Sequence, residues 1–193
     1  MILNETYKMN NDLEIPKIAL GTWLIDDGKV AEAVKEAVKI GYRHIDTAQA
    51  YENERGVGEG VRTCGIPREK IFVTSKVAAE NKSYESAKNS IDETLKKMGL
   101  DYLDMMIIHS PQPWVEVNRT KNRYFEENKE VWAAMQDAVH EGKLKTIGVS
   151  NFLKEDIENI WKIVKFVLRL IRFFRIYLIR RLNLLIIAKK KIF

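Results

Sequence analysis

The stretch that decides the fold reads GYRHIDTAQAYENE over residues 41–54. It opens on the glycine that closes a helical pattern, continues as a strand pattern over residues 42–46, and places Asp46 at the strand's carboxyl end. Tyr51 follows shortly after, in a segment of helical pattern that extends through Val61. In parallel α/β proteins, chemistry gathers at the carboxyl ends of the strands. The stretch therefore predicts a strand that delivers polar side chains to one rim of a parallel sheet.

The rest of residues 1–160 repeats this alternation of strand and helix. Apolar side chains recur at helical spacing in three further segments, and a glycine follows each one. These faces are Val30, Val34 and Val38 before Gly41, then Ala87, Ile91 and Leu95 before Gly99, then Val131, Met135 and Val139 before Gly142. Strand patterns lie between them at residues 18–21, 71–75, 103–108 and 146–150. Five βα units at a spacing of roughly thirty residues predict a parallel sheet. A barrel and a doubly wound sheet fit that count equally well, so the motifs must decide.

The other strand patterns also end on residues that can do chemistry. The third ends on Lys76, the fourth on His109, and the fifth on Ser150 and Asn151. Together with the acid and the phenol of the deciding stretch, an amine and an imidazole converge at one rim. Such a set suits carbonyl reduction, because hydride addition leaves negative charge on the carbonyl oxygen, which then needs a proton.

Tyr51 is the residue that we expect to supply this proton. A tyrosine, with a reference pKa of about 10, is a sluggish acid near neutrality. A neighbouring ammonium, here Lys76, favours the phenolate. We expect Asp46 to hold that ammonium as an ion pair and His109 to orient the carbonyl oxygen.

Three groups of residues resemble known signatures. Residues 41–54 with Gly58 are similar to the first signature of the aldo-keto reductase family. Leu103-Asp104 with His109-Ser110-Pro111, and the segment Gly148–Phe152, are similar to its later signatures. The matches occur in order over residues 15–160. The resemblance covers most of the chain and favours the barrel over the doubly wound sheet.

The resemblance implies a fold, a site and a cofactor. The fold is the α/β (β/α)8 TIM barrel, here truncated to about five βα units. The implied catalytic residues are Asp46, Tyr51, Lys76 and His109; the implied cofactor contacts are Thr22, Asp46, Ser150 and Asn151; and the implied aromatic pocket includes Trp23 and Trp114. We expect NADPH as the cofactor, with NADH as the alternative, a small-molecule carbonyl substrate, no metal, and a monomer at full length.

Several of these residues also have a purely structural interpretation. The alternative for Asp46 and Lys76 is a structural ion pair, and we expect Ser150-Asn151 to cap the following helix in addition to any other role. Glu52 and Glu54, in the same stretch, offer a metal site as an alternative interpretation. No His or Cys stands at ligand spacing from them, so this interpretation is weak.

Charge divides the chain into two parts. Residues 161–193 hold 10 of the 32 basic residues and none of the 27 acidic ones, so residues 1–160 carry a net charge of −5. Because the basic excess is confined to the end of the chain, the whole protein does not have the footprint of a nucleic-acid-binding protein. The single cysteine, Cys64, allows no disulfide framework. No secretory signal pattern stands at the N-terminus, and we expect a cytoplasmic location.

The second part, residues 161–193, does not continue the pattern of the first. It has no Gly, Pro, Asp or Glu and is rich in Ile, Leu, Lys, Arg and Phe. Shifting the reading frame by one base forces Leu or Met, then Glu, then Asn or Asp after Ile160, and permits Val-Asn-Gln-Ile across residues 169–173. We therefore expect this tail to be an out-of-frame reading, foreign to a partial barrel of residues 1–160, and the chain as written to have little or no activity.

The alternative is that this tail, residues 161–193, is a genuine part of the protein. Its basic residues recur at helical spacing, which predicts a helix from about residue 154 into the 180s. Such a basic amphipathic helix would bind a membrane surface or a protein partner, and the remainder would be a catalytically dead fragment. Charges interrupt it too often for a transmembrane span.

Overall fold

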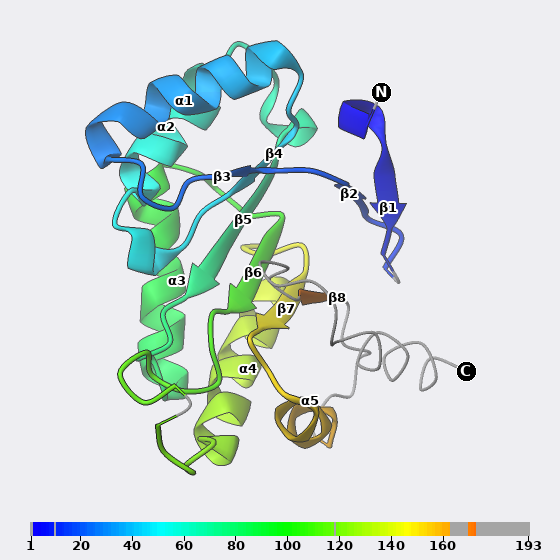
Figure 1. Cartoon of the computed structure of the whole chain (residues 1–193). Helices are drawn as coiled ribbons and strands as arrows, with labels where there is room; N and C mark the ends of the chain where they lie inside the picture. The colour runs from blue at the N-terminus through cyan, green and yellow to red at the C-terminus, as the bar shows by residue number, and fades with distance from the viewer. Residues whose placement is uncertain (1, 10, 118, 163–169, 173–193) are drawn as a thin grey trace.

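A computed structural model describes residues 2–9, 11–117, 119–162 and 170–172 of the chain (Figure 1). The chain starts with a short 3-10 helix, η1 (Ile2–Asn4), and an antiparallel hairpin of β1 (Thr6–Lys8) and β2 (Glu14–Pro16). The hairpin forms its own two-stranded sheet, and the strands after it form a second, parallel sheet.

The parallel sheet has six strands that stand side by side in chain order, from β3 to β8. They are β3 (Leu20–Gly21), β4 (His44–Asp46), β5 (Phe72–Val77), β6 (Met105–Ile108), β7 (Ile147–Ser150) and β8 (Leu170–Arg172). One helix follows each of the first five strands: α1 (Asp27–Ile40), α2 (Glu54–Thr63), α3 (Tyr84–Met98), α4 (Phe125–His140) and α5 (Lys154–Trp161). Two 3-10 helices, η2 (Gln49–Tyr51) and η3 (Arg68–Lys70), lie in the connections.

A doubly wound sheet reverses its strand order at a switch point, whereas a barrel wall does not. The unbroken order therefore confirms the barrel type and the five predicted βα units.

Local chemistry explains where the helices begin and end. The Asp26 carboxylate caps α1 by accepting the backbone N–H of the second residue after it at 2.9 Å, and Ser83 caps α3 in a reciprocal arrangement with Ser86. Both helices end on a glycine in the left-handed region, Gly41 with φ of 118° and Gly99 with φ of 62°. The two helix ends lie at the glycines that the sequence predicts as stops.

Apolar side chains form one cluster on each face of the sheet. In β6, Met106 and Ile108 belong to a large cluster with the buried faces of the helices, whereas Met105 and Ile107 pack with side chains of the β1–β2 hairpin region. Period-two alternation along the strand produces this division. The helices thus cover one face, and the hairpin covers the opposite face near the amino ends of the strands.

Helix α2 packs unusually close to its neighbours because glycines line it. A Cβ atom built on Gly56 would lie 2.2 Å from the carbonyl oxygen of Asp27 in α1, and one on Gly58 would lie 2.1 Å from that of Met98 in α3. Figure 1 shows α1 and α2 lying side by side. Gly58, which belongs to the first signature, is therefore a contact point between helix backbones.

The expectation of one long helix from about residue 154 into the 180s is wrong for the residues that the structure describes. Helix α5 ends at Trp161, and Leu170–Arg172 form β8, paired in parallel with β7. An edge strand offers unpaired backbone groups, and pairing with it overrides a local preference for helix. The rest of the predicted helix, residues 163–169 and the part from residue 173 into the 180s, lies outside the described residues. In the described part of the chain, no helix is long and apolar enough to cross a membrane.

Candidate active site

Lys76 is the centre of a polar site at the carboxyl ends of the strands. It lies in β5 and is fully buried. Its Nζ atom lies 3.1 Å from Asp46 Oδ1, 2.7 Å from the carbonyl oxygen of Thr47 and 3.2 Å from Tyr51 Oη. A buried ammonium is costly to desolvate unless it is paired and hydrogen-bonded. The carbonyl and phenol oxygens accept hydrogen bonds from the ammonium, and the Asp46 carboxylate supplies the countercharge.

Tyr51 is the last residue of η2, the short helix that follows β4. Lys76 Nζ lies 4.5 Å from the centroid of its ring. The ring also meets the imidazole of His109 edge-on, with 5.7 Å between the centroids. His109 stands just beyond β6, and its backbone N–H donates to the carbonyl oxygen of Val77, at the end of β5, at 3.1 Å. The structure thus places all four predicted catalytic residues at one rim.

The two predicted pocket tryptophans lie in different settings. The ring of Trp114 meets His109 edge-on at 4.9 Å between centroids, and 40% of Trp114 is exposed. Trp23 lies on the loop between β3 and α1 and is 61% exposed. Next to it, Leu24 is also strongly exposed and adopts a left-handed φ of 64°. Trp114 therefore borders the polar site directly, and Trp23 presents an apolar surface on the loop that follows β3.

The predicted cofactor residues stand at the ends of β3 and β7. The N–H and hydroxyl of Thr22 both donate to the carbonyl oxygen of Asp46, at 3.0 and 3.3 Å. Ser150 is fully buried at the end of β7. Asn151 adopts a left-handed φ of 61°, and its Nδ2 donates to the carbonyl oxygen of His109 at 2.8 Å. These contacts tie the ends of neighbouring strands together around Lys76.

The expectation that Ser150 and Asn151 cap the following helix is wrong. The N-cap of α5 is Leu153, whose backbone N–H donates to Asp156 Oδ2 at 2.7 Å. The Asn151 side chain instead turns back to His109. Because that contact joins residues far apart in the chain, the sequence pattern at the helix start could not reveal it.

Asn53 is an organising residue for which sequence reasoning proposed no role. It is fully buried, and its Nδ2 donates to the carbonyl oxygens of Thr22 at 2.8 Å and Ile25 at 2.9 Å. Its Oδ1 accepts from the Thr47 hydroxyl at 2.8 Å. One side chain thus joins the loop that carries Trp23 to the segment after β4. Its place in the first signature was the only signal in the sequence.

Glu54 is a buried acid close behind the site. Its carboxylate accepts hydrogen bonds from Ser75 Oγ at 2.6 Å and from Thr94 Oγ1 at 3.1 Å. Burial raises the pKa of Glu54, while these hydroxyl bonds and the charges of Lys97 and Lys76 oppose the rise. Within the described residues, no group of three or more His, Cys, Asp or Glu side chains gathers as metal ligands would.

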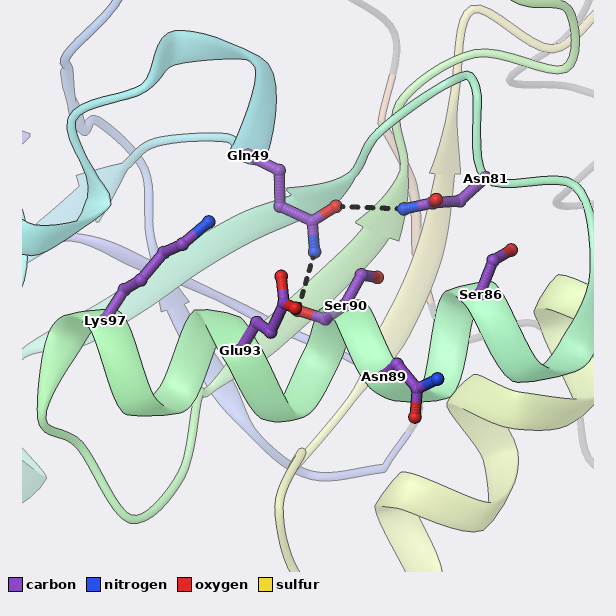
Figure 2. A pocket seen from close by; sticks show the side chains of 7 residues that line it. All are labelled: Gln49, Asn81, Ser86, Asn89, Ser90, Glu93 and Lys97. Atoms are coloured by element: carbon purple, nitrogen blue, oxygen red, sulfur yellow. Dashed lines mark hydrogen bonds between the residues drawn. The ribbon is translucent and has the colours of Figure 1, made fainter.

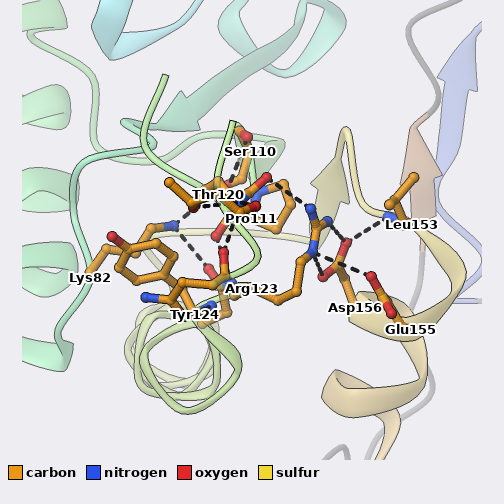
Figure 3. Close-up of polar contacts among 12 residues, drawn as sticks. Lys82, Ser110, Pro111, Thr120, Arg123, Tyr124, Leu153, Glu155 and Asp156 are labelled. Atoms are coloured by element: carbon orange, nitrogen blue, oxygen red, sulfur yellow. Dashed lines mark hydrogen bonds and ion pairs between the residues drawn. The ribbon is translucent and has the colours of Figure 1, made fainter. Parts of the chain in front are cut away.

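The loop between β6 and α4, which carries Trp114, is anchored at both ends (Figure 3). Lys82 Nζ donates to the carbonyl oxygen of Ser110 at 3.2 Å and to Asn128 Oδ1 at 3.0 Å. Burial lowers the pKa of Lys82 to about 8. Arg123 pairs with Asp156 near the start of α5 through two of its nitrogens. The loop is thereby fixed to the connection before α3 on one side and to α5 on the other.

Asp104, which belongs to the second signature, lies at the opposite end of the sheet. Its carboxylate binds Arg68 at 2.8 Å and Lys145 at 2.9 Å, and it accepts the backbone N–H of Val73 at 3.0 Å. These contacts join segments next to β5, β6 and β7 at their amino ends. The position indicates a role in stability rather than in chemistry.

Parallel βα units in unbroken strand order, with a polar site at the carboxyl rim, define a protein of the (β/α)8 barrel class. The chain belongs to the aldo/keto reductase family, whose sequence profile matches residues 17–173.

Individual relatives agree with this assignment. The chain is 40% identical over 161 residues to the glyoxal reductase of Bacillus subtilis, a match that covers 83% of this chain and 54% of the relative. Its fold resembles the crystal structure of an aldo/keto reductase from Brucella melitensis with a TM-score of 0.79 at 38% identity, covering 88% of this chain and 62% of the other. A Bombyx mori aldo-keto reductase in complex with NADP matches with a TM-score of 0.79 at 28% identity, covering 97% and 63% of the two chains. The chain thus spans about half the length of the curated relatives that it matches.

Proposed function

We propose that this chain carries the catalytic rim of an enzyme that reduces a small aldehyde or ketone with NADPH, with Tyr51 as the proton donor. The observation that carries the proposal is the distance of 3.2 Å between Lys76 Nζ and Tyr51 Oη. A phenol is a weak acid near neutrality, and an ammonium in contact with it stabilises the phenolate that remains after proton transfer. Membership of the aldo/keto reductase family supports the same reaction.

Each residue of the rim has a part in that reaction. The reduced nicotinamide supplies the hydride when bound. Tyr51 donates a proton from Oη to the carbonyl oxygen as negative charge develops there. His109, edge-on to the Tyr51 ring, orients the same oxygen by hydrogen bonding. Lys76 stabilises the phenolate, and Asp46 keeps the ammonium in place as its buried counterion.

The residues at the strand ends fit a nicotinamide. Its carboxamide has one acceptor and two donors and carries no charge, and Ser150 and Asn151 offer neutral hydroxyl and amide groups of the same kind. Thr22 and Asp46, joined through the Asp46 carbonyl oxygen, complete the proposed contacts. The Bombyx mori relative was crystallised with NADP, which supports NADPH as the cofactor, with NADH as the alternative.

The substrate side of the rim is aromatic. Trp114 borders His109, and Trp23 is exposed on the loop that follows β3. We propose that these two rings hold the apolar part of the substrate while the polar rim holds its carbonyl group. Small organic carbonyl compounds match such a surface.

We further propose that the 193-residue chain alone has little or no reductase activity. Its described strands form an open sheet of six, whereas the site of a (β/α)8 barrel is assembled from the loops of eight strands. In the complete barrel, we propose a monomer that acts in the cytoplasm, a reducing compartment to which the lone Cys64 is suited.

A chimera tests the function. Residues 1–160 would be joined to the remaining half of the Bacillus subtilis glyoxal reductase, and NADPH oxidation would be followed with glyoxal and a series of small aldehydes. We expect turnover by the chimera and not by the 193-residue chain. Tyr51→Phe should lower kcat by about 10²–10⁴-fold while NADPH affinity stays nearly unchanged. Tyr7→Phe, in the exposed hairpin, is the matched control. A folded chimera without activity, or a Tyr51→Phe chimera with normal turnover, would contradict the proposal.

A further inference from the structure

One side chain outside the proposed catalytic set joins the segment of Tyr51 to the strand of Lys76. Gln49, the first residue of η2, extends towards α3 and the end of β5 (Figure 2). Its Oε1 accepts the backbone N–H of Ala78 at 2.7 Å and lies 3.5 Å from Asn81 Nδ2. Its Nε2 donates to the carbonyl oxygen of Ser90 and to Thr94 Oγ1, both at 3.1 Å. Both ends of the amide are therefore used, and they reach two different elements.

The contact with Ala78 matters most because of where it lies. Ala78 follows β5 directly and stands two residues after Lys76, while Gln49 stands two residues before Tyr51. A hydrogen bond between these positions fixes the distance between the two short segments. It therefore limits how far Tyr51 Oη can move from Lys76 Nζ.

A second path from Gln49 leads to the other side of Lys76. Thr94, which accepts from Gln49, donates to the buried Glu54 carboxylate, and that carboxylate accepts from Ser75 Oγ. Ser75 precedes Lys76 in β5. Ser75, Thr94 and Glu54 are all buried, so water does not easily replace these bonds. Gln49 is thus connected to β5 on both sides of Lys76.

We propose that Gln49 is a positioning residue that holds Tyr51 Oη in contact with Lys76 Nζ. The inference rests on the proposed function, because the contact between the phenol and the ammonium matters for catalysis only if Tyr51 is the proton donor. Gln49 does not contact the reacting atoms. It acts by fixing the position of η2, the short helix that ends on Tyr51.

The surroundings of Gln49 provide a clean comparison. The amide borders a polar groove of about 260 Å³, whose other lining residues are Asn81, Ser86, Asn89, Ser90, Glu93 and Lys97. Gln49→Met keeps the length of the side chain and removes both hydrogen-bonding ends, and the groove offers room for it. Asn89→Ala removes another amide from the same groove, on the surface of α3, and serves as the matched control.

The protonation of Tyr51 reports on its contact with Lys76. The 193-residue chain, labelled with ¹³C at tyrosine Cζ and free of cofactor, would be titrated by NMR. Tyr51→Phe would assign the signal among the seven tyrosines. Among the described residues, Lys76 of β5 and His109 after β6 contact the Tyr51 side chain, and Asp46 of β4 pairs with Lys76. Gln49→Met, Asn89→Ala and Thr94→Val leave these three groups in place. We expect Gln49→Met to raise the midpoint of the Tyr51 titration by about one pH unit, within the range of about 1–3 units that a nearby opposite charge produces.

The outcomes separate the inference from the proposed function. An unchanged midpoint in a folded Gln49→Met chain, or an equal rise in Asn89→Ala, overturns the positioning role, whatever the chimera does. If Gln49→Met does not fold by circular dichroism, Thr94→Val removes one partner of the amide and should give a smaller rise, and an unchanged midpoint there overturns it as well. A chimera that lacks reductase activity contradicts the proposed function even if the midpoint moves as expected.

Discussion

Lys76 Nζ lies 3.1 Å from Asp46 Oδ1, and both side chains are buried at the carboxyl ends of the adjacent strands β5 and β4. A buried ion pair seldom adds net stability, because desolvation of two charges offsets their attraction. Its presence at this rim agrees with the role proposed for Lys76, a fixed positive charge in contact with Tyr51.

Removing one member of this pair should destabilise the chain strongly. We expect Lys76→Met to lower the free energy of unfolding by about 3–5 kcal/mol, because the Asp46 carboxylate stays buried without its counterion. The double variant Asp46→Leu with Lys76→Met should recover most of the loss. Urea unfolding followed by circular dichroism measures both. A loss below about 1 kcal/mol in the single variant would show that the carboxylate is compensated by other groups.

A second ion pair, Arg123 with Asp156, is expected to stabilise the loop of Trp114. The Asp156 hydrogen bond, together with the pair's Coulomb attraction, raises the pKa of Arg123 above its usual range. Asp156 also accepts the N–H of Leu153 at the start of α5. Asp156→Asn should therefore lower the free energy of unfolding by about 3 kcal/mol or more.

The control for that prediction lies one residue away. Glu155 faces the same Arg123 at 3.5 Å but is largely exposed. Glu155→Gln should change the free energy of unfolding by less than about 1 kcal/mol, as exposed ion pairs do. Equal effects of the two substitutions would mean that burial of Asp156 contributes nothing.

The parts of the fold that follow from local chemistry could be predicted from the sequence. The stops at Gly41 and Gly99 depend on neighbouring residues alone, and the structure has them at the predicted positions. The tail shows the opposite case. Leu170–Arg172 sit in a stretch of helical preference and yet pair with β7. Strand pairing is a tertiary contact, and the sequence of the tail alone does not predict it.

The candidate site divides in the same way. The order of Asp46, Tyr51, Lys76 and His109 along the chain is enough to predict that they share a rim, because strands of a parallel sheet all end on the same side. The role of Gln49 depends on contacts with residues 29 to 45 positions away. Such contacts are decided by how α3 packs beside β5, which one sequence does not reveal.

The close approach of α2 and α3 gives a further prediction. At a position inside a helix, alanine is normally more stable than glycine by about 1 kcal/mol. At position 58 its Cβ would lie 2.1 Å from the Met98 backbone, which cannot give way easily, so Gly58→Ala should lower the free energy of unfolding despite that gain. Gly21→Ala meets nothing within 4 Å and should be tolerated. A Gly58→Ala chain as stable as wild type would mean that the two helices can separate at little cost.

The proposal that residues 161–193 are an out-of-frame reading is tested at the level of DNA. We expect the frame shifted by one base after codon 160 to continue without a stop for about 270 bases or more, enough to complete a barrel of about 250 residues. The shifted reading of residues 169–173, Val-Asn-Gln-Ile, falls where β8 pairs with β7. Early stop codons in both other frames would contradict the proposal and would favour a tail that belongs to the fold.

Glu54 provides the prediction with a defined pH dependence. Burial raises the pKa of this acid in the folded chain above its ordinary value of 4.5. Between the two values the folded state binds more protons than the unfolded state, so the contribution of Glu54 to stability is fully present below about pH 4.5 and is lost as the pH rises through the raised pKa.

Glu54→Gln cannot ionise and should lack this loss. The free energy of unfolding of wild type, relative to Glu54→Gln, should therefore fall as urea unfolding is moved from pH 4 towards neutrality. Glu85→Gln, an exposed acid in the first turn of α3, controls for the removal of one charge. A difference between wild type and Glu54→Gln that rises with pH would show that Ser75, Thr94, Lys97 and Lys76 together outweigh burial and hold the carboxylate ionised.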